Sequence, residues 1–172
     1  MRKEIYLAGG CFWGLQRYFD CVHGVVETEV GYANAVVRCP SYELVCTGVT
    51  HAAEAVRVVF DTEMLSLDDV LRLFFDAIDP TTVNRQGNDR GTQYRSGIYT
   101  RSEEELRRAE RFVEAEQARY SVALAVEVQP LENFWPAEEY HQKYLESNPR
   151  GYCHIGEEAF KHARNYKVSE AG

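Results

Sequence analysis

Residues 3–14, with the sequence KEIYLAGGCFWG, contain the turn on which both the predicted fold and the predicted chemistry depend. Residues 3–8 alternate loosely between polar and apolar and predict a strand that ends at Gly9 and Gly10. Residues 12–19 have apolar side chains at helical spacing and predict a short helix. Cys11 therefore lies where a strand turns into a helix, facing free N–H groups and the positive end of the helix dipole. Both favour a thiolate, so Cys11 is a candidate nucleophile, with an inert thiol beside core aromatics as the alternative.

Length and charge limit the classes of protein to consider. The chain has 172 residues and a net charge of -8, which favours one domain and argues against nucleic acid or an anionic membrane as partner. No apolar run approaches the roughly 18 residues that a membrane span needs. The N-terminal residues lack the apolar region of a signal peptide. We therefore expect a cytoplasmic protein.

Periodicity along the chain predicts an alternation of strands and helices. Ser66 and Ser102 each precede an acidic residue by three positions, as in a capping box, and predict helices that end before Pro80 and near residue 118. A further short helix is predicted near residues 137–145, and a long loop over residues 32–50. Strands are predicted over residues 3–8, 25–31, 55–60, 94–99 and 123–128.

This order of elements predicts an α+β fold. The β-α-β-β-α-β core indicates a two-layer, ferredoxin-like sandwich with an additional helix and a long coiled C-terminal tail. We expect residues 1–172 to form a single catalytic domain whose tail is mobile from about residue 147.

The five cysteines, at positions 11, 21, 39, 46 and 153, argue against a disulfide framework, because their number is odd and no secretion signal is visible. No Cys-x-x-Cys pair is present, and the spacing of Cys21 and His23 does not suit common structural zinc sites. The sequence therefore predicts no metal site.

The string Gly10-Cys11-Phe12-Trp13-Gly14 resembles the signature of A-type peptide-methionine sulfoxide reductases. The resemblance continues from about residue 4 to residue 160, and several blocks occur in the right order and at fitting spacings. The further matching blocks are residues 40–42 (PSY), 54–56 (EAV), 87–96 (GNDRGTQYRS), 140–145 (YHQKYL) and 148–153 (NPRGYC).

The resemblance implies a role for each matching residue in the first reaction step. Cys11 attacks the sulfoxide sulfur, and Glu54 protonates the oxygen with help from the phenols of Tyr42 and Tyr94. Burial of Glu54, at the start of an apolar strand, would raise its pKa toward working pH. The neighbouring aromatic pair and Asp89 are implied in substrate binding. Phe12 and Trp13 resemble the family's pocket for the S-methyl group, and Asp89, which read alone is turn chemistry, matches a position that orders the site.

The resemblance also implies how the enzyme recovers. Attack leaves a sulfenic acid on Cys11, which a second thiol condenses into a disulfide. Cys153, in the Gly-containing tail, is the candidate, and Cys39 and Cys46 in the predicted loop are alternatives. A thioredoxin would reduce the disulfide, with no metal or organic cofactor. The implied substrates are methionine S-sulfoxide in oxidised proteins or peptides, and free methionine sulfoxide.

Some positions depart from the family pattern. His51 lies one place earlier than the family's histidine, so no role is carried onto it. Residues 33–35 (ANA) replace a Gly-rich turn, and no recycling cysteine follows Cys153. A single resolving cysteine is therefore predicted, and Cys21 is expected to be structural.

Two other functions remain open on the sequence. A cysteine hydrolase would pair Cys11 with a base such as His141 or His51. A binding module without catalysis would use the aromatic side chains of residues 12, 13, 42 and 94 as a cage.

Overall fold

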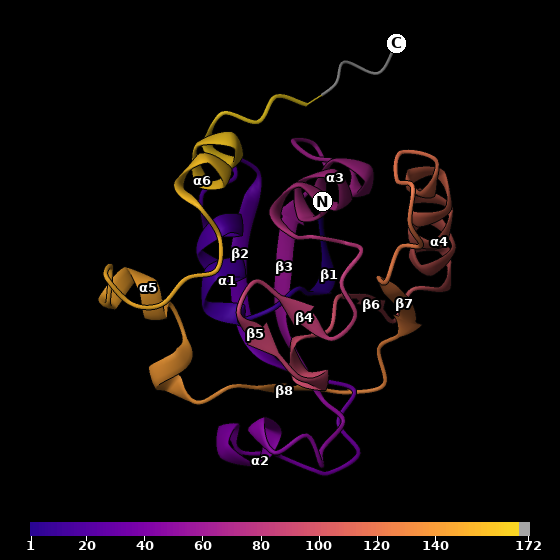
Figure 1. Ribbon diagram of the computed structural model, residues 1–172. Helices are drawn as coiled ribbons and strands as arrows, with labels where there is room; N and C mark the ends of the chain where they lie inside the picture. The colour runs from indigo at the N-terminus through magenta and orange to yellow at the C-terminus, as the bar shows by residue number, and fades with distance from the viewer. Residues whose placement is uncertain (169–172) are drawn as a thin grey trace.

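The computed structural model describes residues 1–168, and residues 169–172 of the predicted domain lie outside the described part. A six-stranded sheet forms its centre, with the strand order β7-β6-β1-β3-β2-β8 (Figure 1). Neighbouring strands are antiparallel except β6 and β7, which are parallel. The strands are β1 (Arg2–Ala8), β2 (Val25–Ala33), β3 (Ala53–Asp61), β6 (Gly97–Thr100), β7 (Glu127–Pro130) and β8 (Phe134–Pro136).

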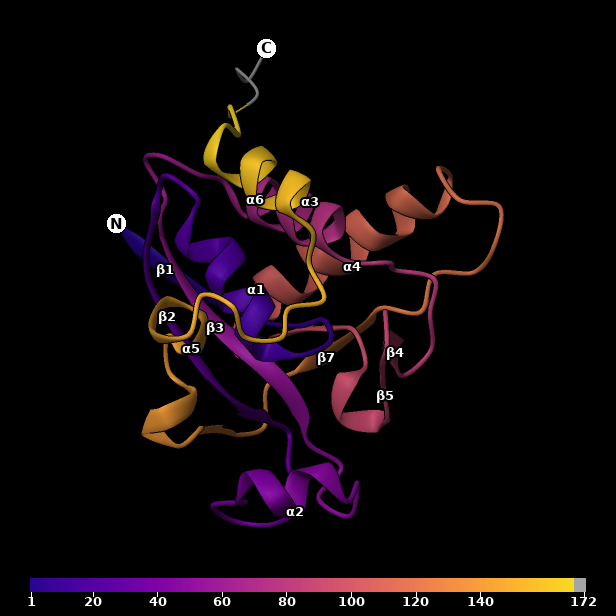
Figure 2. The same ribbon diagram turned by 60° about the vertical axis from the view of Figure 1, so that its left-hand side comes forward.

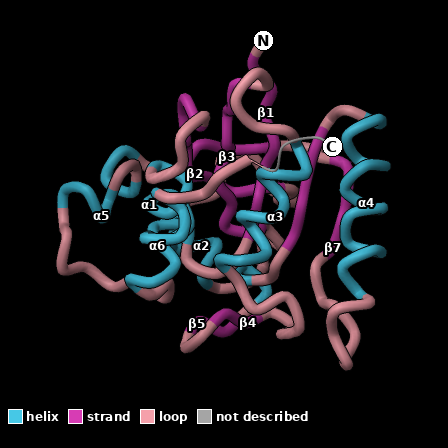
Figure 3. The backbone as a smooth tube through the Cα atoms, turned by 90° about the horizontal axis from the view of Figure 1, so that it is seen from above, coloured by secondary structure: helices cyan, strands magenta, loops and turns pink. Residues whose placement is uncertain are grey.

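Helices α1 (Phe12–Asp20), α3 (Leu67–Ala77) and α6 (Glu157–Arg164) lie together on one side of strands β1 to β3 (Figure 3). Helix α4 (Glu103–Gln117) lies beside α3, toward the β6–β7 end of the sheet. The main core lies between these helices and the sheet and contains most of the large buried aliphatic and aromatic side chains. The predicted α+β class is therefore confirmed.

The helix starts follow the predicted capping residues. Ser66 and Asp69 form a complete capping box at α3, as predicted. At α4, Ser102 accepts the N–H of Glu105, but the Glu105 carboxylate accepts a hydrogen bond from Thr100 Oγ1 instead of returning to Ser102. Only half of the second predicted capping box is present, because a strand residue competes for the carboxylate.

The alternation of side chains along β3 decides which face Glu54 occupies. Val56, Val58 and Phe60 belong to the core under the helices, whereas Ala53 and Ala55 belong to a smaller cluster on the opposite face. Successive side chains of a strand point to opposite faces. Glu54 therefore points under α1, toward the turn that contains Cys11.

Short elements differ from the prediction. The expected loop over residues 32–50 contains the end of β2 and the short helix α2 (Tyr42–Cys46). In place of the helix expected near residues 137–145 there are a 3-10 turn η2 (Glu139–His141) and α5 (Tyr144–Ser147). Strand β7 begins four residues later than expected, β8 was not predicted, and the loop at residues 85–91 contains a small hairpin, β4 (Arg85–Gln86) and β5 (Asp89–Arg90). A 3-10 turn, η1 (Thr92–Tyr94), follows it.

The C-terminal tail is not coil throughout, which corrects the prediction. Helix α6 packs on α1 and α3 (Figure 2) and buries Phe160 and Ala163. Tyr166 donates a hydrogen bond of 2.8 Å to Asp69, and His162 lies 2.9 Å from Asp76. Residues 148–156, between α5 and α6, form an irregular segment, and residues 165–168 follow α6 without regular secondary structure.

No helix within residues 1–168 combines the length and apolarity needed to cross a membrane.

Candidate active site

Cys11 is the N-cap of α1, so the strand-to-helix turn is placed as predicted. Gly10 has a φ of +82°, which a residue without Cβ adopts freely, and this lets the chain reverse into the helix. The sulfur, however, is buried, with only 7% of the residue exposed. Burial, followed by the charge of Glu54, raises the pKa of Cys11, and a hydrogen bond from the backbone N–H of Trp13 acts in the opposite direction. In this site burial opposes ionisation of the thiol, whereas the helix N-terminus that Cys11 caps favours the thiolate. The role of Cys11 as the nucleophile stays a prediction.

Glu54 lies beneath the same turn, as its strand position requires. Its Oε1 accepts the backbone N–H of Phe12 at 3.2 Å, and its Oε2 is buried with no partner among the described residues. The residue is 1% exposed. Burial raises the pKa of Glu54 to about 8, so the carboxyl group is largely protonated at neutral pH. The expected burial of Glu54 is confirmed.

Two phenols share this environment. Burial and the charge of Glu54 are the two largest causes that raise the pKa of both Tyr42 and Tyr94. Tyr42 begins α2, and Tyr94 ends η1. Segments distant in sequence thus bring two neutral O–H groups near one buried carboxyl group and the Cys11 thiol.

Phe12 and Trp13 form an aromatic wall next to Cys11. Phe12 is fully buried, whereas Trp13 is only partly buried and stacks on Tyr144 with ring centroids 3.8 Å apart. The indole N–H of Trp13 donates to His141 Nδ1 at 2.9 Å. This hydrogen bond fixes the plane of the indole beside the nucleophile.

Two residues support the site in ways that were not identified from the sequence. His141 orients Trp13, and burial lowers its pKa, so its ring stays neutral and can accept the indole N–H. Glu138 accepts the O–H of Tyr32 at 2.7 Å and the N–H of Tyr42 at 3.0 Å. Glu138 therefore fixes the start of α2. Of these two residues, only His141 could have been found from the sequence, since it belongs to the block at residues 140–145 that matches the family, whereas Glu138 lies outside the matching blocks.

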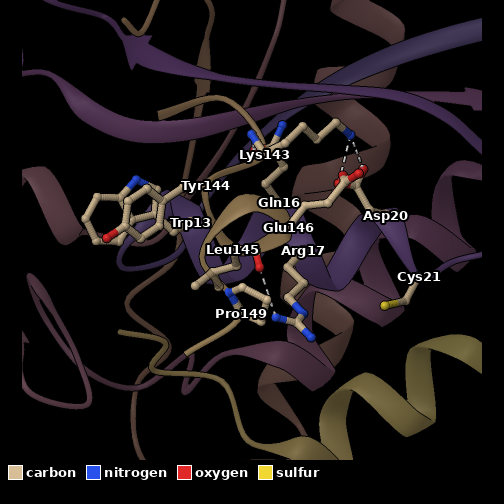
Figure 4. Close-up of a pocket in the computed structure, with 10 residues that line it drawn as sticks. All are labelled: Trp13, Gln16, Arg17, Asp20, Cys21, Lys143, Tyr144, Leu145, Glu146 and Pro149. Atoms are coloured by element: carbon tan, nitrogen blue, oxygen red, sulfur yellow. Dashed lines mark hydrogen bonds and ion pairs between the residues drawn. The ribbon is translucent and has the colours of Figure 1, made fainter. Parts of the chain in front are cut away.

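A groove of about 300 Å³ runs along the outer side of α1, beside Trp13 and Tyr144 (Figure 4). Lys143 and Asp20 form an ion pair of 2.8 Å at one end, and Arg17 donates to the carbonyl of Leu145. Cys21 lines this groove. It is the C-cap of α1, at the opposite end of the helix from Cys11.

Cys153 lies on the surface of α1, at Gly14. A Cβ atom built on Gly14 would be 3.0 Å from the sulfur of Cys153. Residues at positions i and i+3 of a helix are surface neighbours, with Cβ atoms about 5–6 Å apart. The sulfur of Cys153 therefore lies against the first turn of α1, the helix that Cys11 caps.

Asp89 lies at the edge of this cluster. Its charge contributes to the raised pKa of Cys11 after burial and Glu54, and its Oδ2 lies 3.9 Å from His154 Nδ1. Cys39 and Cys46 are exposed. Within residues 1–168, no group of three or more His, Cys, Asp or Glu side chains is arranged to hold a metal ion.

The alternative of a cysteine hydrolase finds no support in this geometry. His141 Nδ1 is occupied by the Trp13 indole, and His51 is exposed, with a φ of +58°. No histidine of the described chain hydrogen-bonds to the Cys11 thiol. A base within hydrogen-bond reach is what such a mechanism requires.

Comparisons with known proteins identify the family to which the chain belongs. A family model described as peptide methionine sulfoxide reductase matches residues 3–171. Peptide methionine sulfoxide reductase MsrA of Lachnoclostridium phytofermentans is 50% identical over 165 residues, which cover 96% of this chain and 99% of that protein. Mxr1 from Saccharomyces cerevisiae in reduced form is 39% identical and covers 88% of each chain, with a TM-score of 0.84. Mxr1 in complex with Trx2 is 25% identical, with a TM-score of 0.60 over 83% of this chain and 84% of that one. This chain therefore belongs to the peptide methionine sulfoxide reductase family, whose members are oxidoreductases that act on methionine sulfoxide.

Proposed function

We propose that Cys11 and Glu54 carry out the reduction of methionine S-sulfoxide, free or in proteins, to methionine. The observation that carries this proposal is the buried Glu54 carboxyl group. It is hydrogen-bonded to the residue after Cys11, and burial raises its pKa to about 8. A nucleophile and a protonated acid thus lie side by side, and reduction of a sulfoxide needs both.

In the first step, the Cys11 sulfur attacks the sulfoxide sulfur while Glu54 gives its proton to the sulfoxide oxygen. The proton of the Cys11 thiol returns to the Glu54 carboxylate. The oxygen ends on Cys11 as a sulfenic acid, and the thioether leaves as methionine, so cysteine is oxidised as the sulfoxide is reduced. The O–H groups of Tyr42 and Tyr94 stay protonated because burial raises their pKa, and they donate hydrogen bonds to the oxygen.

Substrate selection rests on the aromatic wall. Phe12 and Trp13 hold the S-methyl group, and His141 keeps the indole in place. Contacts between sulfur and an aromatic ring are worth about 0.3–1.5 kcal/mol each. Asp89 orders the rim of this site through the loop that follows β4.

Cys153 is the proposed resolving cysteine. It attacks the sulfenic acid of Cys11, and the products are a Cys11–Cys153 disulfide and water. The position of its sulfur at Gly14 supports this role, because Gly14 is in the first turn of the helix that Cys11 caps. Two exposed thiols remain the alternatives: Cys39 precedes α2, and Cys46 is the last residue of α2.

A thioredoxin is the proposed reductant of this disulfide, supported by the Trx2 complex of Mxr1. The reaction as written uses thiols alone and calls for no metal or organic cofactor. We propose a cytoplasmic location, because the odd number of cysteines argues against the disulfide framework of a secreted protein.

We further propose that residues 1–172 act as a single catalytic domain with a ferredoxin-like core. The order β6-β1-β3-β2 and the antiparallel pairing of these four strands support this layout. The moving part of the tail is proposed to be residues 148–156, because α6 packs on α1 and α3.

Mass spectrometry after one stoichiometric dose of methionine sulfoxide tests the function. The native enzyme is expected to release about one methionine and to gain a Cys11–Cys153 disulfide. Cys11→Ser is expected to release none, whereas Cys21→Ser, the matched control next to the end of the same helix, behaves like the native enzyme. Methionine release by Cys11→Ser would refute the proposed nucleophile.

Cys153→Ser separates the two steps. We expect it to release about one methionine and then to stop when thioredoxin is the reductant. Normal cycling in this variant would transfer the resolving role to Cys39 or Cys46. A binding module without catalysis would release no methionine in any variant.

A further inference from the structure

His154, the residue after Cys153, is buried in the same cluster and has no role in the chemistry described so far. Its side chain is 4% exposed. The ring lies against Gly10 and Gly14, since a Cβ built on either glycine would be within 3.3 Å of a ring nitrogen. It is therefore enclosed between the reactive turn and the first turn of α1.

The hydrogen bonds of His154 determine which ring nitrogen is basic. Nε2 lies 3.0 Å from the carbonyl oxygen of Gly9, which can only accept, so Nε2 carries the proton. Nδ1 is then unprotonated and carries a lone pair that can accept a proton. Among the described residues it has no hydrogen-bond partner, although it is buried. A buried acceptor without a donor is uncommon in native proteins and points to a function.

Asp89 faces this nitrogen as a second unpartnered acceptor. Its Oδ2 is buried without a hydrogen-bond partner in the described chain and lies 3.9 Å from Nδ1. Two facing acceptors leave a place for one proton between them. A proton taken up by Nδ1 would produce an imidazolium beside a carboxylate, which is a favourable pair in a buried site.

The thiol of Cys153 is a nearby source of that proton. Its sulfur and His154 Nδ1 lie 3.0 and 3.3 Å from the same point, the Cβ position of Gly14. Burial raises the pKa of Cys153, so the thiol needs a base before it can attack. The sulfur donates to the carbonyl of Ile155 at 3.4 Å, so this hydrogen bond must break before the thiol can give its proton to His154.

We propose that His154 is the general base of the resolving step, with Asp89 as the residue that stabilises its protonated form. His154 Nδ1 takes the proton from Cys153 as its sulfur attacks the sulfenic sulfur of Cys11. The S–S bond forms, the S–O bond breaks, and the proton leaves with the hydroxide as water. Cys153 is oxidised and the sulfenic acid is reduced. This inference rests on the proposed function, in which Cys153 resolves Cys11.

The charges around His154 set the expected pH dependence. Burial lowers its pKa, and Asp89 from β5 and the Gly9 carbonyl partly oppose this. Cys11 follows Gly10, against which the ring lies, and Tyr152 is close enough to Asp89 for the carboxylate, after burial, to raise the pKa of its phenol. The charges of Arg17 on α1 and Glu157 on α6 act on Cys153. Because His154 is neutral at neutral pH, a base-assisted step is expected to be nearly independent of pH from about neutrality to the ordinary cysteine pKa of about 8.5.

The test is a rapid-quench experiment on the full-length enzyme, with one equivalent of methionine sulfoxide and no reductant. Quenching with an alkylating reagent and mass spectrometry reports methionine release and disulfide formation separately. For His154→Gln, whose amide can still donate to Gly9, we expect normal methionine release and disulfide formation slowed about 100-fold, as for loss of a positioned base. Its remaining rate should rise with pH, about tenfold per pH unit, because the thiol must then ionise unaided.

His162→Gln is the matched control, since His162 is exposed on α6 and lies against Asp76 rather than against a thiol. Equal rates and equal pH profiles of disulfide formation in the native enzyme and His154→Gln would overturn the inference. If His154→Gln does not fold, a native rate that itself rises tenfold per pH unit over this range would overturn it. Absence of methionine release from the native enzyme would instead refute the proposed function.

Discussion

At the scale of single residues, the proposed chemistry depends on the protonation state of one carboxyl group. Glu54 is held in a site that solvates its charge poorly, with one hydrogen bond and one free buried oxygen among the described residues. The protonated form, which can donate a proton, is therefore favoured. Protonation of Glu54 also removes the negative charge that, after burial, contributes most to the raised pKa of Cys11.

The rate of methionine release is expected to fall above about pH 8. The reason is that the pKa of Glu54 is raised to about 8, so the acid form disappears as the pH rises through this value. Single-turnover release of methionine across this range measures the effect. Glu54→Gln should lower the rate by about 100-fold and remove the fall, since it cannot deliver a proton. A native rate that is level or rising between about pH 7 and 9 would contradict the role of Glu54.

The same group is expected to make the fold less stable as the pH rises. Because the pKa of Glu54 is raised from 4.5 to about 8 in the folded state, the native protein holds a proton that the unfolded chain has lost, and stability declines between these two values. A pKa difference of one between the two states corresponds to about 1.4 kcal/mol, so the full effect is on the order of a few kcal/mol. Glu54→Gln should gain stability over the native protein at about pH 8.5 and little at about pH 4.5.

Urea unfolding at both pH values measures this difference. Glu63→Gln serves as the control, because Glu63 is exposed just beyond the end of β3. An equal gain for Glu54→Gln at both pH values would show that the carboxyl group is not protonated in the fold.

At the scale of elements, helix α1 organises both proposed redox steps. Its N-cap is Cys11, its first turn carries the aromatic wall, and Gly14 leaves room for the Cys153 sulfur. One turn later, the Arg17 guanidinium lies 5.4 Å from the centre of the Phe160 ring of α6. The helix therefore touches both ends of the segment that carries the second thiol.

Gly14→Ala is expected to displace Cys153 from α1. The new methyl group would lie 3.0 Å from the sulfur, so the thiol must move, although alanine by itself favours a helix by about 1 kcal/mol. We expect faster alkylation of Cys153 and slower disulfide formation, with methionine release unchanged. Peptide mapping after timed alkylation measures both.

Gly156→Ala offers the matched change in the same segment, because its added Cβ would have nothing within 4 Å. Equal alkylation rates of Cys153 in Gly14→Ala and the native enzyme would show that the sulfur does not rest on α1.

At the scale of the whole molecule, the C-terminal segment is fastened at both ends. Gln142 and Lys143 bond to β2 and α1, and Phe160 and Tyr166 fix α6 beyond the thiol. Residues 148–156 thus form a loop with two anchored ends (Figure 2). A short tether of this kind keeps a thiol close to its target, because closing a short loop costs little entropy.

Phe160→Ala is expected to destabilise the whole domain. Phe160 is 4% exposed within the main core, and truncation of a buried phenylalanine costs about 3–5 kcal/mol. Urea unfolding at neutral pH measures the loss. Val122→Ala, at an exposed site, should change stability by less than about 0.5 kcal/mol. A similarly small effect of Phe160→Ala would mean that α6 does not pack on the core in solution.

Local signals in the sequence were sufficient for the long elements. The capping residues Ser66 and Ser102 mark helix starts, and the turn at Gly9 and Gly10 leads into α1, because these signals act over three or four neighbouring residues. Short elements such as α2, β8 and α5 were missed or misplaced. Their stability comes from contacts such as that of Glu138 with Tyr42, more than ninety positions apart in the chain.

The sequence by itself determined the α+β class, the reactive turn and, through its motifs, the family. Only the tertiary structure decided the direction in which the pKa values of Cys11 and Glu54 shift, because desolvation depends on what the fold packs around a group. It likewise decided that Cys153 and His154 lie on Gly14, since a distance between residues far apart in the chain exists only once the chain has folded.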